Sequence, residues 1–488
     1  MSRTVVVSNR LPALAEPGRP GPPEILAGGL ASAVYAAVRG IRDSLWFGWS
    51  GRTETAGRTL CLEQRRSGGL DLVGMSLTPR DLADYYHGFC NGVLWPLFHC
   101  FQGRIRMSLA HEAGYRRVQA RFAAALRPLL RPRDRVWVHD YHLLLLGRAL
   151  RRLGWDGRIG FFLHIPFPPH ELWQVLPDPR GFLEAMLEYD LVGFQTSGSL
   201  DGYVYSCRRL LGARLDAGVL SAGPRSQRVG VYPVGIDPRD FQSPPGSPGG
   251  RGRRGLLSRV VRGRRLILGV DRLDYTKGIP AKIEAYEDFL MRYPRWRKKV
   301  SFIQVASPTR TGAAHYQEQK RLVEAIVGRV NGEMAEHDWV PIRYLYRSYP
   351  RHLLARFYRE ASVGLVTPLR DGMNLVAKEF VAAQAPESPG VLVLSRCAGA
   401  AEDLHDAIIV NPFVPADVAD GIERALAMTL EERRSRHQAL LRHILASTVT
   451  DWGLRFMDDL VRGAGHGPSP PRPPGRAARI EPLTISDR

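Results

Sequence analysis

The stretch GLVTPLRDGMNLVAKEFVAAQ, residues 364–384, has the pattern of a strand, a tight turn and a helix in direct succession. Its first residues form a short apolar run, as expected for a strand that is covered on both faces. An Asp-Gly pair then predicts a turn, and an apolar-rich segment from about Asn374 to Gln384 predicts a helix. This unit is the building block of an open parallel sheet with helices on its faces, so it predicts an α/β fold.

Similar runs rich in Val, Ile and Phe recur along the whole chain, with helical patterns such as residues 29–41 and 109–130 between them. They are residues 4–7, 136–138, 159–163, 191–194, 229–234, 266–270, 302–305, 363–366, 391–394 and 407–410. These runs are more numerous than the strands of one ordinary sheet, which favours two doubly wound domains.

A segment rich in Pro, Gly and Ser at residues 237–255 cannot continue a strand or a helix, so it marks a domain boundary. The predicted domains are residues 1–238 and 239–455. A tail rich in Pro and Arg at residues 463–488 is predicted to be disordered.

The chain has 488 residues and a net charge of +20, which predicts contact with a nucleic acid, a membrane surface or a phosphorylated small molecule. Residues 251–265 hold seven arginines and no acid. Five cysteines without a Cys-x-x-Cys pair predict neither a disulfide framework nor a zinc site. No apolar stretch has the length of a signal peptide or a membrane span, so a cytoplasmic protein without a membrane partner is expected.

Ligands of open α/β sheets bind beyond the carboxyl ends of the strands, so the polar residues after each apolar run form the candidate site. DRLDYTKG, residues 271–278, places Arg272 and Lys277 on a short loop, where two fixed cations suit a pyrophosphate. A surface ion-pair loop that uses Asp271 and Asp274 explains the same residues equally well. The spacing alone leaves both interpretations open.

The helix predicted after the Asp-Gly turn begins with free N–H groups and a positive dipole end, which together favour an anion. Glu379 lies about one turn in, where a carboxylate can accept both hydroxyls of a ribose, although acids are common near helix starts. Gly28 and Gly29 would let the backbone approach a ligand closely. The chain lacks a GxGxxG dinucleotide fingerprint directly after a predicted strand, a GxxxxGK[ST] P-loop and an Asp-x-Asp motif, which counts against a Rossmann dehydrogenase, a P-loop kinase and metal-dependent nucleotide-sugar enzymes.

His139, Asp140 and His142 follow one apolar run, but no further Cys or His cluster accompanies them, so no metal site is predicted. Asp140 is instead predicted to be a hydrogen-bond acceptor or an acid/base group. His164 ends another run, where a buried core histidine and a site histidine fit the sequence equally. An aromatic set in the N-terminal half fits either a core or a sugar-binding platform. Its members are Trp46, Trp49, Trp95, Tyr85 and Tyr86.

A series of motifs in this order resembles the trehalose-6-phosphate synthase family, whose members are retaining glucosyltransferases. The motifs are VVVSNR, AGGL, LWFGWSG, DYYHGFCNGVLWPLFH, HDYHLL, GFFLHIPFP, DLVGFQT, VDRLDYTKGI and GLVTPLRDGMNLVAKEFVAAQ. The resemblance runs from about Ser2 to Leu460. It implies a GT-B architecture, in which two facing Rossmann-like domains enclose a cleft, with no essential metal, no cofactor, and a return helix at residues 456–462.

The resemblance also implies roles for the candidate residues. The positions that match the glucose 6-phosphate (acceptor) site are Arg10, Tyr86 and Asp140, joined by Arg310 from the other domain. The positions that match the nucleotide-sugar (donor) site are Gly28 and Gly29 near the sugar, His164 beside it, Arg272 and Lys277 at the diphosphate, Asp371 at the donor glucose, Leu375, Val376, Ala377 and Lys378 at the phosphate-binding helix start, and Glu379 at the ribose. Trp95 and Ile165 match residues that shape the anomeric outcome. The predicted catalytic residues are Arg272, Lys277, Asp371, His164 and Asp140.

The segment YLYRSYPRHLL, residues 344–354, departs from the family pattern, because Tyr349 stands where a Phe is common. Tyr349 is the predicted base-binding position, and recognition of the nucleobase is open. UDP-glucose is the expected donor, with GDP-glucose and ADP-glucose as alternatives.

The expected reaction transfers glucose from a nucleoside diphosphate glucose to glucose 6-phosphate and forms α,α-trehalose 6-phosphate. The alternatives are a transferase with another acceptor, such as glycerol 3-phosphate or a pseudo-sugar, a catalytically silent regulatory paralogue, and a basic nucleic-acid-binding protein. A silent paralogue would be expected to lack some of the predicted site residues, and none is lost. The expected partners are the small-molecule substrates, a second copy of the chain in a homo-oligomer, and a separate phosphatase that acts on the product; no nucleic-acid partner is expected.

Overall fold

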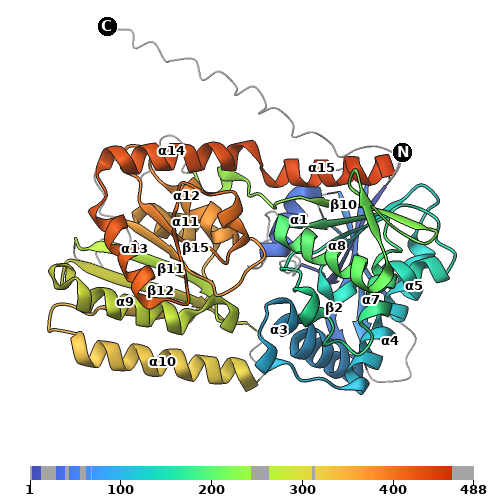
Figure 1. The fold of residues 1–488 in the computed structure, drawn as a ribbon, viewed down its shortest axis with the longest axis horizontal. Coiled ribbons are helices and arrows are strands. Elements are labelled where there is room, and N and C mark those ends of the chain that lie inside the picture. Colours follow the sequence, from blue (N-terminus) through green and yellow to red (C-terminus); the bar gives the residue numbers. More distant parts are fainter. Residues whose placement is uncertain are drawn as a thin grey trace, which may run out of the picture.

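The chain folds into two halves, each a sheet covered by helices, which Figure 1 shows side by side. The first half contains the sheet of β1 to β10, and the second half contains the sheet of β11 to β16. The computed structural model describes residues 3–12, 29–38, 43–54, 62–67, 69–242, 263–309 and 314–463. The first sheet has ten strands in the order β3-β4-β2-β1-β5-β6-β7-β10-β9-β8, and the second has six in the order β13-β12-β11-β14-β15-β16. The predicted α/β class with two sheets is confirmed.

The first sheet is parallel from β4 to β10, and the described strands at its two edges run antiparallel. Its strands are β1 (Thr4–Arg10), β2 (Ser44–Thr53), β3 (Leu62–Ser67), β4 (Leu70–Leu77), β5 (Arg135–His139), β6 (Ile159–Phe162), β7 (Leu191–Phe194), β8 (Arg214–Asp216), β9 (Val219–Ala222) and β10 (Arg225–Val231). In β1 every residue before Arg10 is buried, because helices cover both faces of a parallel sheet. Arg10 therefore emerges at the carboxyl end of the strand.

The second sheet is parallel at every described strand pair. Its strands are β11 (Arg265–Arg272), β12 (Val300–Ser307), β13 (Ile342–Leu345), β14 (Val363–Val366), β15 (Val391–Ser395) and β16 (Ile408–Val410). The interior of β11 is buried and its terminal Arg272 is exposed, which repeats the arrangement of Arg10 in the first sheet.

Helices connect the strands of both sheets. The α-helices are α1 (Gly29–Val38), α2 (Pro79–Asp81), α3 (Trp95–Phe98), α4 (Leu109–Leu126), α5 (Leu146–Arg152), α6 (His170–Trp173), α7 (Pro179–Met186), α8 (Ser197–Leu211), α9 (Ile279–Arg292), α10 (Ala314–Met334), α11 (Arg351–Glu360), α12 (Leu375–Ala383), α13 (Pro415–Ala427), α14 (Leu430–Ala446) and α15 (Val449–Arg462). A π-helix, η1 (Leu82–Leu94), precedes α3. The 3₁₀ turns are η2 (Gln102–Arg104), η3 (Arg127–Leu129), η4 (Tyr141–Leu143), η5 (Pro238–Asp240), η6 (Tyr275–Lys277), η7 (Pro294–Trp296) and η8 (Gly399–Glu402).

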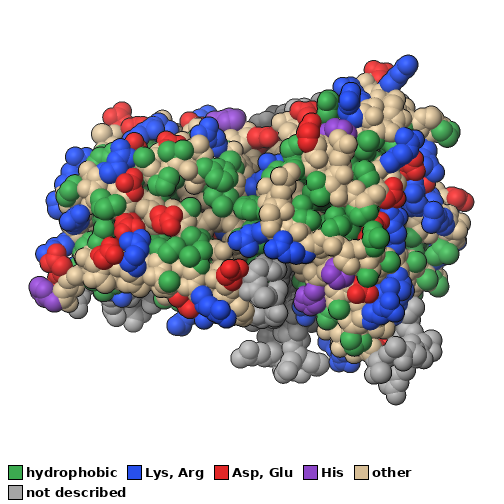
Figure 2. Space-filling model, turned by 60° about the horizontal axis from the view of Figure 1, so that its bottom comes forward, with side chains coloured by type: hydrophobic (Ala, Val, Ile, Leu, Met, Phe, Trp, Pro, Cys, Tyr) green, Lys and Arg blue, Asp and Glu red, His purple; other side chains and the backbone are tan. Residues whose placement is uncertain are grey.

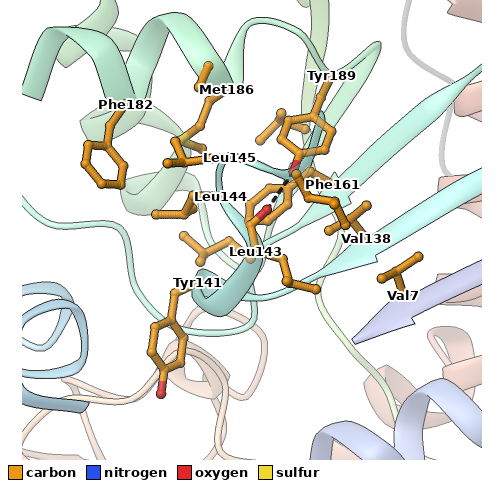
Figure 3. Packing of buried hydrophobic residues seen from close by; sticks show 14 of the residues in the cluster. Val7, Val138, Tyr141, Leu143, Leu144, Leu145, Phe161, Phe182, Met186 and Tyr189 are labelled. Atoms are coloured by element: carbon orange, nitrogen blue, oxygen red, sulfur yellow. Dashed lines mark hydrogen bonds between the residues drawn. The ribbon is translucent and has the colours of Figure 1, made fainter. Parts of the chain in front are cut away.

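A large apolar cluster lies between the first sheet and the helices on one of its faces (Figure 3). Val138 and Phe161 contribute to it from β5 and β6, and Met186 contributes from α7; all three are fully buried. Tyr189 places its hydroxyl in this apolar setting and donates it to the carbonyl oxygen of Leu143 at 2.7 Å. That bond satisfies a polar group that would otherwise be costly to bury, so the cluster stays closed around it.

All ten apolar runs predicted as strands contain a strand. The observed ends differ from the predicted ones mainly where a proline lies nearby. The run at residues 229–234 was expected to be extended throughout, but β10 ends at Val231. Pro233 follows, and a proline has no N–H to give to the ladder. The helix predicted at residues 109–130 ends at Leu126 and continues as the 3₁₀ turn η3, which contains Pro128.

The last helix, α15, packs against the first half of the chain, although α14 before it lies on the second half (Figure 1). Its fully buried Trp452 lies 4.9 Å from the ring of Trp137 and 5.0 Å from that of Phe162, and Phe456 stacks on Trp137 at 4.9 Å. Thr448 and Asp451 form a capping box that starts the helix. The segment that returns to the first half thus begins earlier than residue 456; the domain boundaries themselves stay predictions.

In the described part of the chain, no helix combines the length and the apolar character that crossing a bilayer requires.

Replacing Trp452 with Ala is expected to lower the free energy of unfolding of the first half by about 3–5 kcal/mol, because it empties a closed aromatic cluster. Leu454 lies on the same helix and is largely exposed, so Leu454→Ala serves as the control and is expected to change stability by about 0.5 kcal/mol or less. Urea denaturation followed by circular dichroism measures both. Equal midpoints for the two variants would contradict the assigned packing of α15.

Candidate active site

The carboxyl ends of strands from both sheets meet where the two halves touch, a region called the junction from here on. Arg272, at the end of β11, lies with its guanidinium carbon 5.5 Å from the ring centroid of Trp95 in the first half. Trp95 begins α3 and is buried. A cation over an aromatic face is attracted by the ring quadrupole, so this contact links the two halves at the candidate site.

In the first half, five side chains follow one another in a continuous row, called the aromatic row. Arg10 lies with its guanidinium carbon 5.1 Å from the ring centroid of Trp49, whose ring is 6.0 Å from that of Tyr86. Tyr86 stacks on His142 at 6.1 Å, and His142 Nδ1 is 3.9 Å from Asp140 Oδ2. The structure therefore joins Arg10, Tyr86 and Asp140, which the resemblance groups at the acceptor site, through one row of contacts.

Asp140 follows β5 in a conformation that few residues other than glycine adopt, with φ at +73°. Its backbone N–H donates to the carbonyl oxygen of Phe162 at 2.8 Å, and its Oδ1 accepts the backbone N–H of His164 at 3.2 Å. These bonds hold a strained residue in place between β5 and β6. Such strain is typical of functional positions.

His164 lies at the end of β6 and contacts a second histidine. Its Nε2 is 3.1 Å from Nδ1 of His139. Burial lowers the pKa of His164 to about 3, so the ring is neutral at pH 7. Ile165 follows and is buried against the same apolar cluster as Trp95.

In the second half, Lys277 forms an ion pair with Asp371, and Asn374 Nδ2 donates to Asp371 Oδ2 at 3.0 Å. Asp271, offered above as a surface partner for the DRLDYTKG loop, instead pairs with the buried Lys282 at 2.5 Å. The two candidate cations thus lie at the junction rather than in a surface ion-pair loop with Asp271. Lys277 and Asp371 compensate each other's charge there.

Helix α12 begins at Leu375, directly after Asn374, whose φ is +72°. Asn374 makes no side-chain cap bond to the helix, and its amide nitrogen donates to Asp371. Lys378 points its ammonium away from the helix start: Nζ donates to Val234 O at 3.0 Å and to Asp403 Oδ2 at 2.9 Å. Of the predicted phosphate-binding segment, Lys378 can therefore contribute only its backbone and the helix dipole.

Glu379 lies one turn into α12 and accepts a hydrogen bond from the Tyr358 hydroxyl at 3.0 Å. Burial raises the pKa of Glu379, while the charge of Arg351 and the Tyr358 bond oppose that rise. Tyr349, the predicted base-binding residue, packs its ring 5.1 Å from Phe357, and Arg347 lies over it at 5.9 Å. The side chains of Glu379 and Tyr349 are both half-buried, and both belong to the second half.

Two glycines let the backbones of the halves touch. A Cβ on Gly372 would lie 2.1 Å from the carbonyl oxygen of His164 and 2.9 Å from Ile165 Cα. A Cβ on Gly399 would lie 2.8 Å from Thr196 Cγ2 and 1.9 Å from the carbonyl oxygen of Gly372. No side chain fits at such distances, so the contact depends on glycine at both positions. The sequence argument treated Gly372 only as a turn residue and missed this role.

Two of the predicted site residues, Gly28 and Arg310, lie outside the described residues. Gly29 is the first residue of α1. The remaining predicted residues lie in the aromatic row, at the junction or along α12, except Tyr349, which precedes α11 and packs against it. Within the described ranges, no group of three or more His, Cys, Asp or Glu side chains is placed to hold a metal ion.

Comparisons with known proteins identify the family of this chain. The model of the family described as "Glycosyltransferase family 20" matches residues 2–462. This chain belongs to glycosyltransferase family 20. A trehalose-6-phosphate synthase of Sinorhizobium fredii, similar to this family-20 chain, is 42% identical over 462 residues, which cover 94% of this chain and 98% of the relative.

Two solved structures are also similar to this family-20 chain. One is a UDP-forming alpha,alpha-trehalose-phosphate synthase from Burkholderia xenovorans in complex with glucose-6-phosphate, with a TM-score of 0.88, 42% identity, and coverage of 94% of this chain and 100% of that one. The other, from E. coli, is bound with UDP-2-fluoro glucose and has a TM-score of 0.86, 40% identity, and coverage of 94% and 99%. The fold of the family-20 chain is therefore GT-B.

Replacing Gly372 with Ala is expected to force the halves apart by about 1 Å, because backbone atoms cannot yield to the new methyl group. We expect the rate of glycosyl transfer to fall about 100-fold, the usual cost of such a misplacement, with circular dichroism unchanged. Gly328→Ala is the matched control, because Gly328 lies on α10 with nothing within 4 Å of its would-be Cβ. A full rate in Gly372→Ala would contradict the contact.

Protonation of His99 is expected to lower the free energy of unfolding in mild acid. His99 is buried beside Trp95, and burial lowers its pKa from 6.5 to about 4. In the unfolded chain His99 binds a proton below about pH 6.5, whereas in the folded chain it does so only below about pH 4. The contribution of His99 to the free energy of unfolding is therefore complete above pH 6.5 and decreases as the pH falls from 6.5 to 4. Between pH 7 and pH 5 the expected loss from this residue is about 2 kcal/mol.

The measurement is the free energy of unfolding in urea at pH 7 and pH 5 for the wild type and for His99→Gln. The pH-dependent difference is expected to shrink by that amount in His99→Gln and to stay unchanged in His352→Gln, whose side chain is exposed. An identical pH dependence in wild type and His99→Gln would show that His99 titrates normally.

Proposed function

We propose that this chain transfers glucose from UDP-glucose to glucose 6-phosphate and forms α,α-trehalose 6-phosphate and UDP, with retention of configuration at the donor carbon. The observation that carries the proposal is the arrangement at the junction. Arg272, Lys277 and the start of α12 bring positive charge from the second half to Trp95 and His164 of the first half, and His164 is bonded to Asp140, the last member of the aromatic row. Such a junction suits a donor diphosphate on one side and a phosphorylated sugar on the other.

The second half is proposed to hold the donor. Arg272 and Lys277 would bind the diphosphate, Arg272 as a planar fork and Lys277 as a point charge. The N–H groups at the start of α12, from Leu375 to Lys378, would add the helix dipole. Glu379 would accept the ribose hydroxyls; the Tyr358 bond leaves its second oxygen for this purpose. The half-buried Tyr349 would offer its ring to the base.

The proposed donor glucose would contact Asp371 and His164, and the family resemblance adds Gly28 and Gly29 as backbone neighbours of the sugar. When the donor diphosphate arrives, Lys277 would exchange part of its contact with Asp371 for the phosphate oxygens. Asp371 would then be released to accept a sugar hydroxyl. This exchange keeps both charges compensated in the empty and the loaded site, so neither is left buried and unpaired.

The first half is proposed to hold the acceptor. Arg10, at the exposed end of β1, would bind the phosphate of glucose 6-phosphate together with Tyr86 and Arg310. Asp140 would accept a hydroxyl of the acceptor sugar. Gripping the phosphate at a distance from the reacting hydroxyl orients that hydroxyl, and this binding energy lowers the barrier to transfer.

In the proposed reaction, the bond between the donor carbon and the diphosphate oxygen breaks, and the anomeric hydroxyl of the acceptor attacks from the same face. Negative charge develops on the leaving oxygen, where Arg272, Lys277 and the helix start would stabilise it. The hydroxyl proton would pass to that leaving oxygen. Trp95 and Ile165, buried at the junction, would restrict the direction of attack.

The alternatives find less support. In the view of Figure 2, Lys and Arg side chains are dispersed and interleaved with Asp and Glu, whereas a nucleic-acid surface would gather them. The Arg-rich segment at residues 251–265 lies almost wholly outside the described residues. With a different acceptor, the aromatic row would not bind glucose 6-phosphate, the acceptor proposed for it above. A homo-oligomer, a separate phosphatase downstream and a cytoplasmic location stay predictions.

The test is to incubate the purified protein with glucose 6-phosphate and, in turn, with UDP-, GDP- and ADP-glucose, and to measure nucleoside diphosphate and trehalose 6-phosphate. We expect product with UDP-glucose. In Arg272→Ala the turnover is expected to fall by at least about 100-fold, because a donor to the leaving oxygen is lost. Arg292→Ala, which removes an arginine that pairs with Asp420 on α13, is the control with full turnover.

Product with none of the three donors would refute the proposed function. Product that forms equally well with glycerol 3-phosphate in place of glucose 6-phosphate would favour the alternative acceptor. A folded Arg272→Ala protein with a normal rate would remove Arg272 from the diphosphate site while leaving the reaction in place.

A further inference from the structure

His139 is a fully buried histidine that the proposed reaction does not use. It is the last residue of β5 and has none of its surface exposed. Its ring is enclosed by aromatic rings: Trp137 at 4.6 Å, His164 at 5.3 Å and Trp452 at 6.2 Å. Its Nδ1 is 3.1 Å from Nε2 of His164, the candidate donor-site histidine. A polar ring placed in an apolar cluster calls for an explanation, because burial of this kind is costly.

Both rings of this pair are neutral, because burial lowers the pKa of each well below 7. Each neutral imidazole carries one N–H, so the contact has one of two directions. Either His139 donates from Nδ1 to His164 Nε2, or His164 donates from Nε2 to His139 Nδ1. The two directions give opposite tautomers of His164.

The surroundings of His139 distinguish the two directions. Its Nε2 is buried and has no hydrogen-bond partner among the described residues. The indole N–H groups of Trp137 and Trp452, whose rings pack on His139, are also buried donors without a partner among those residues. If His139 accepted the bond, its own proton would lie on Nε2 and add a third orphaned donor to the cluster. Orphaned buried N–H groups are the rarest kind of unsatisfied group.

If His139 donates instead, Nε2 carries a lone pair and the cluster gains no further donor. With Nε2 of His164 engaged as the acceptor, the proton of His164 must lie on Nδ1, the only nitrogen left for a ligand.

We propose that His139 is a positioning residue, which donates Nδ1–H to His164 Nε2 and fixes His164 as the tautomer that offers Nδ1–H to an oxygen of the donor sugar. The inference rests on the proposed function for the identity of that sugar. A ring with its tautomer locked from behind presents a donor at all times, without a charge and without the cost of reorganising during the reaction.

The first test compares two replacements of His139. His139→Leu keeps an apolar side chain in the cluster and removes the N–H, whereas His139→Asn places an amide N–H near the former Nδ1. We expect His139→Leu to lower kcat about 10- to 100-fold, as lost supporting hydrogen bonds do, with KM for glucose 6-phosphate unchanged. His139→Asn is expected to recover most of that loss.

Trp137→Phe is the control for packing. It disturbs the ring that contacts His139 most closely but leaves the bond between the histidines in place. It is expected to lower the midpoint of thermal unfolding while kcat stays near the wild-type value. A purely structural role for His139 would make His139→Asn as slow as His139→Leu, or Trp137→Phe equally slow, and either result would overturn the proposal.

The second test reads the tautomer directly and needs no turnover. Nitrogen-15 NMR of the wild-type protein with labelled histidine rings, assigned with His164→Gln, is expected to show His164 protonated at Nδ1 and bare at Nε2 at pH 7. Protonated Nε2 would overturn the proposal. If the wild type makes no trehalose 6-phosphate, the proposed function fails and the tautomer result stands; if it does and His139→Leu equals it, only the role of His139 fails.

Discussion

The contact between the backbone at Gly372 and the carbonyl oxygen of His164 is the constraint on which the candidate site depends. It leaves no room for a side chain between the two halves. Because Gly372 adjoins Asp371 and follows β14, while His164 lies just beyond the end of β6, the contact holds the donor residues of one half close to the sugar-facing residues of the other. Arg272 lies over the ring of Trp95 across the same junction.

The chain also ties the halves together away from that contact. Lys378 holds the carbonyl oxygen of Val234, just after the first sheet ends, and the backbone N–H of Val449 donates to the carbonyl oxygen of Ile236. These bonds lie where the chain passes between the halves.

The strands that sequence could predict are those that the fold covers on both faces. Residues 191–194 and 363–366 coincide with β7 and β14, because a continuous apolar run has no other stable place. Strand β2 escaped prediction because Gly48, Ser50 and Gly51 interrupt its apolar run, and β8 because it is a half-exposed edge strand with alternating polar residues. Polar residues at strand ends were predictable for the same reason as the strands.

What sequence could not supply is the pairing of groups that lie far apart in the chain. Neither the ion pair of Lys277 with Asp371 nor the bond of His139 with His164 has a spacing that would indicate it. The same holds for α15, whose Trp452 completes a cluster begun by Trp137 and Phe162. During synthesis the first sheet leaves the ribosome long before that helix exists, so its aromatic face stays uncovered until the end of the chain emerges. The first half, although it is synthesised first, therefore completes its aromatic cluster only after α15 has been synthesised.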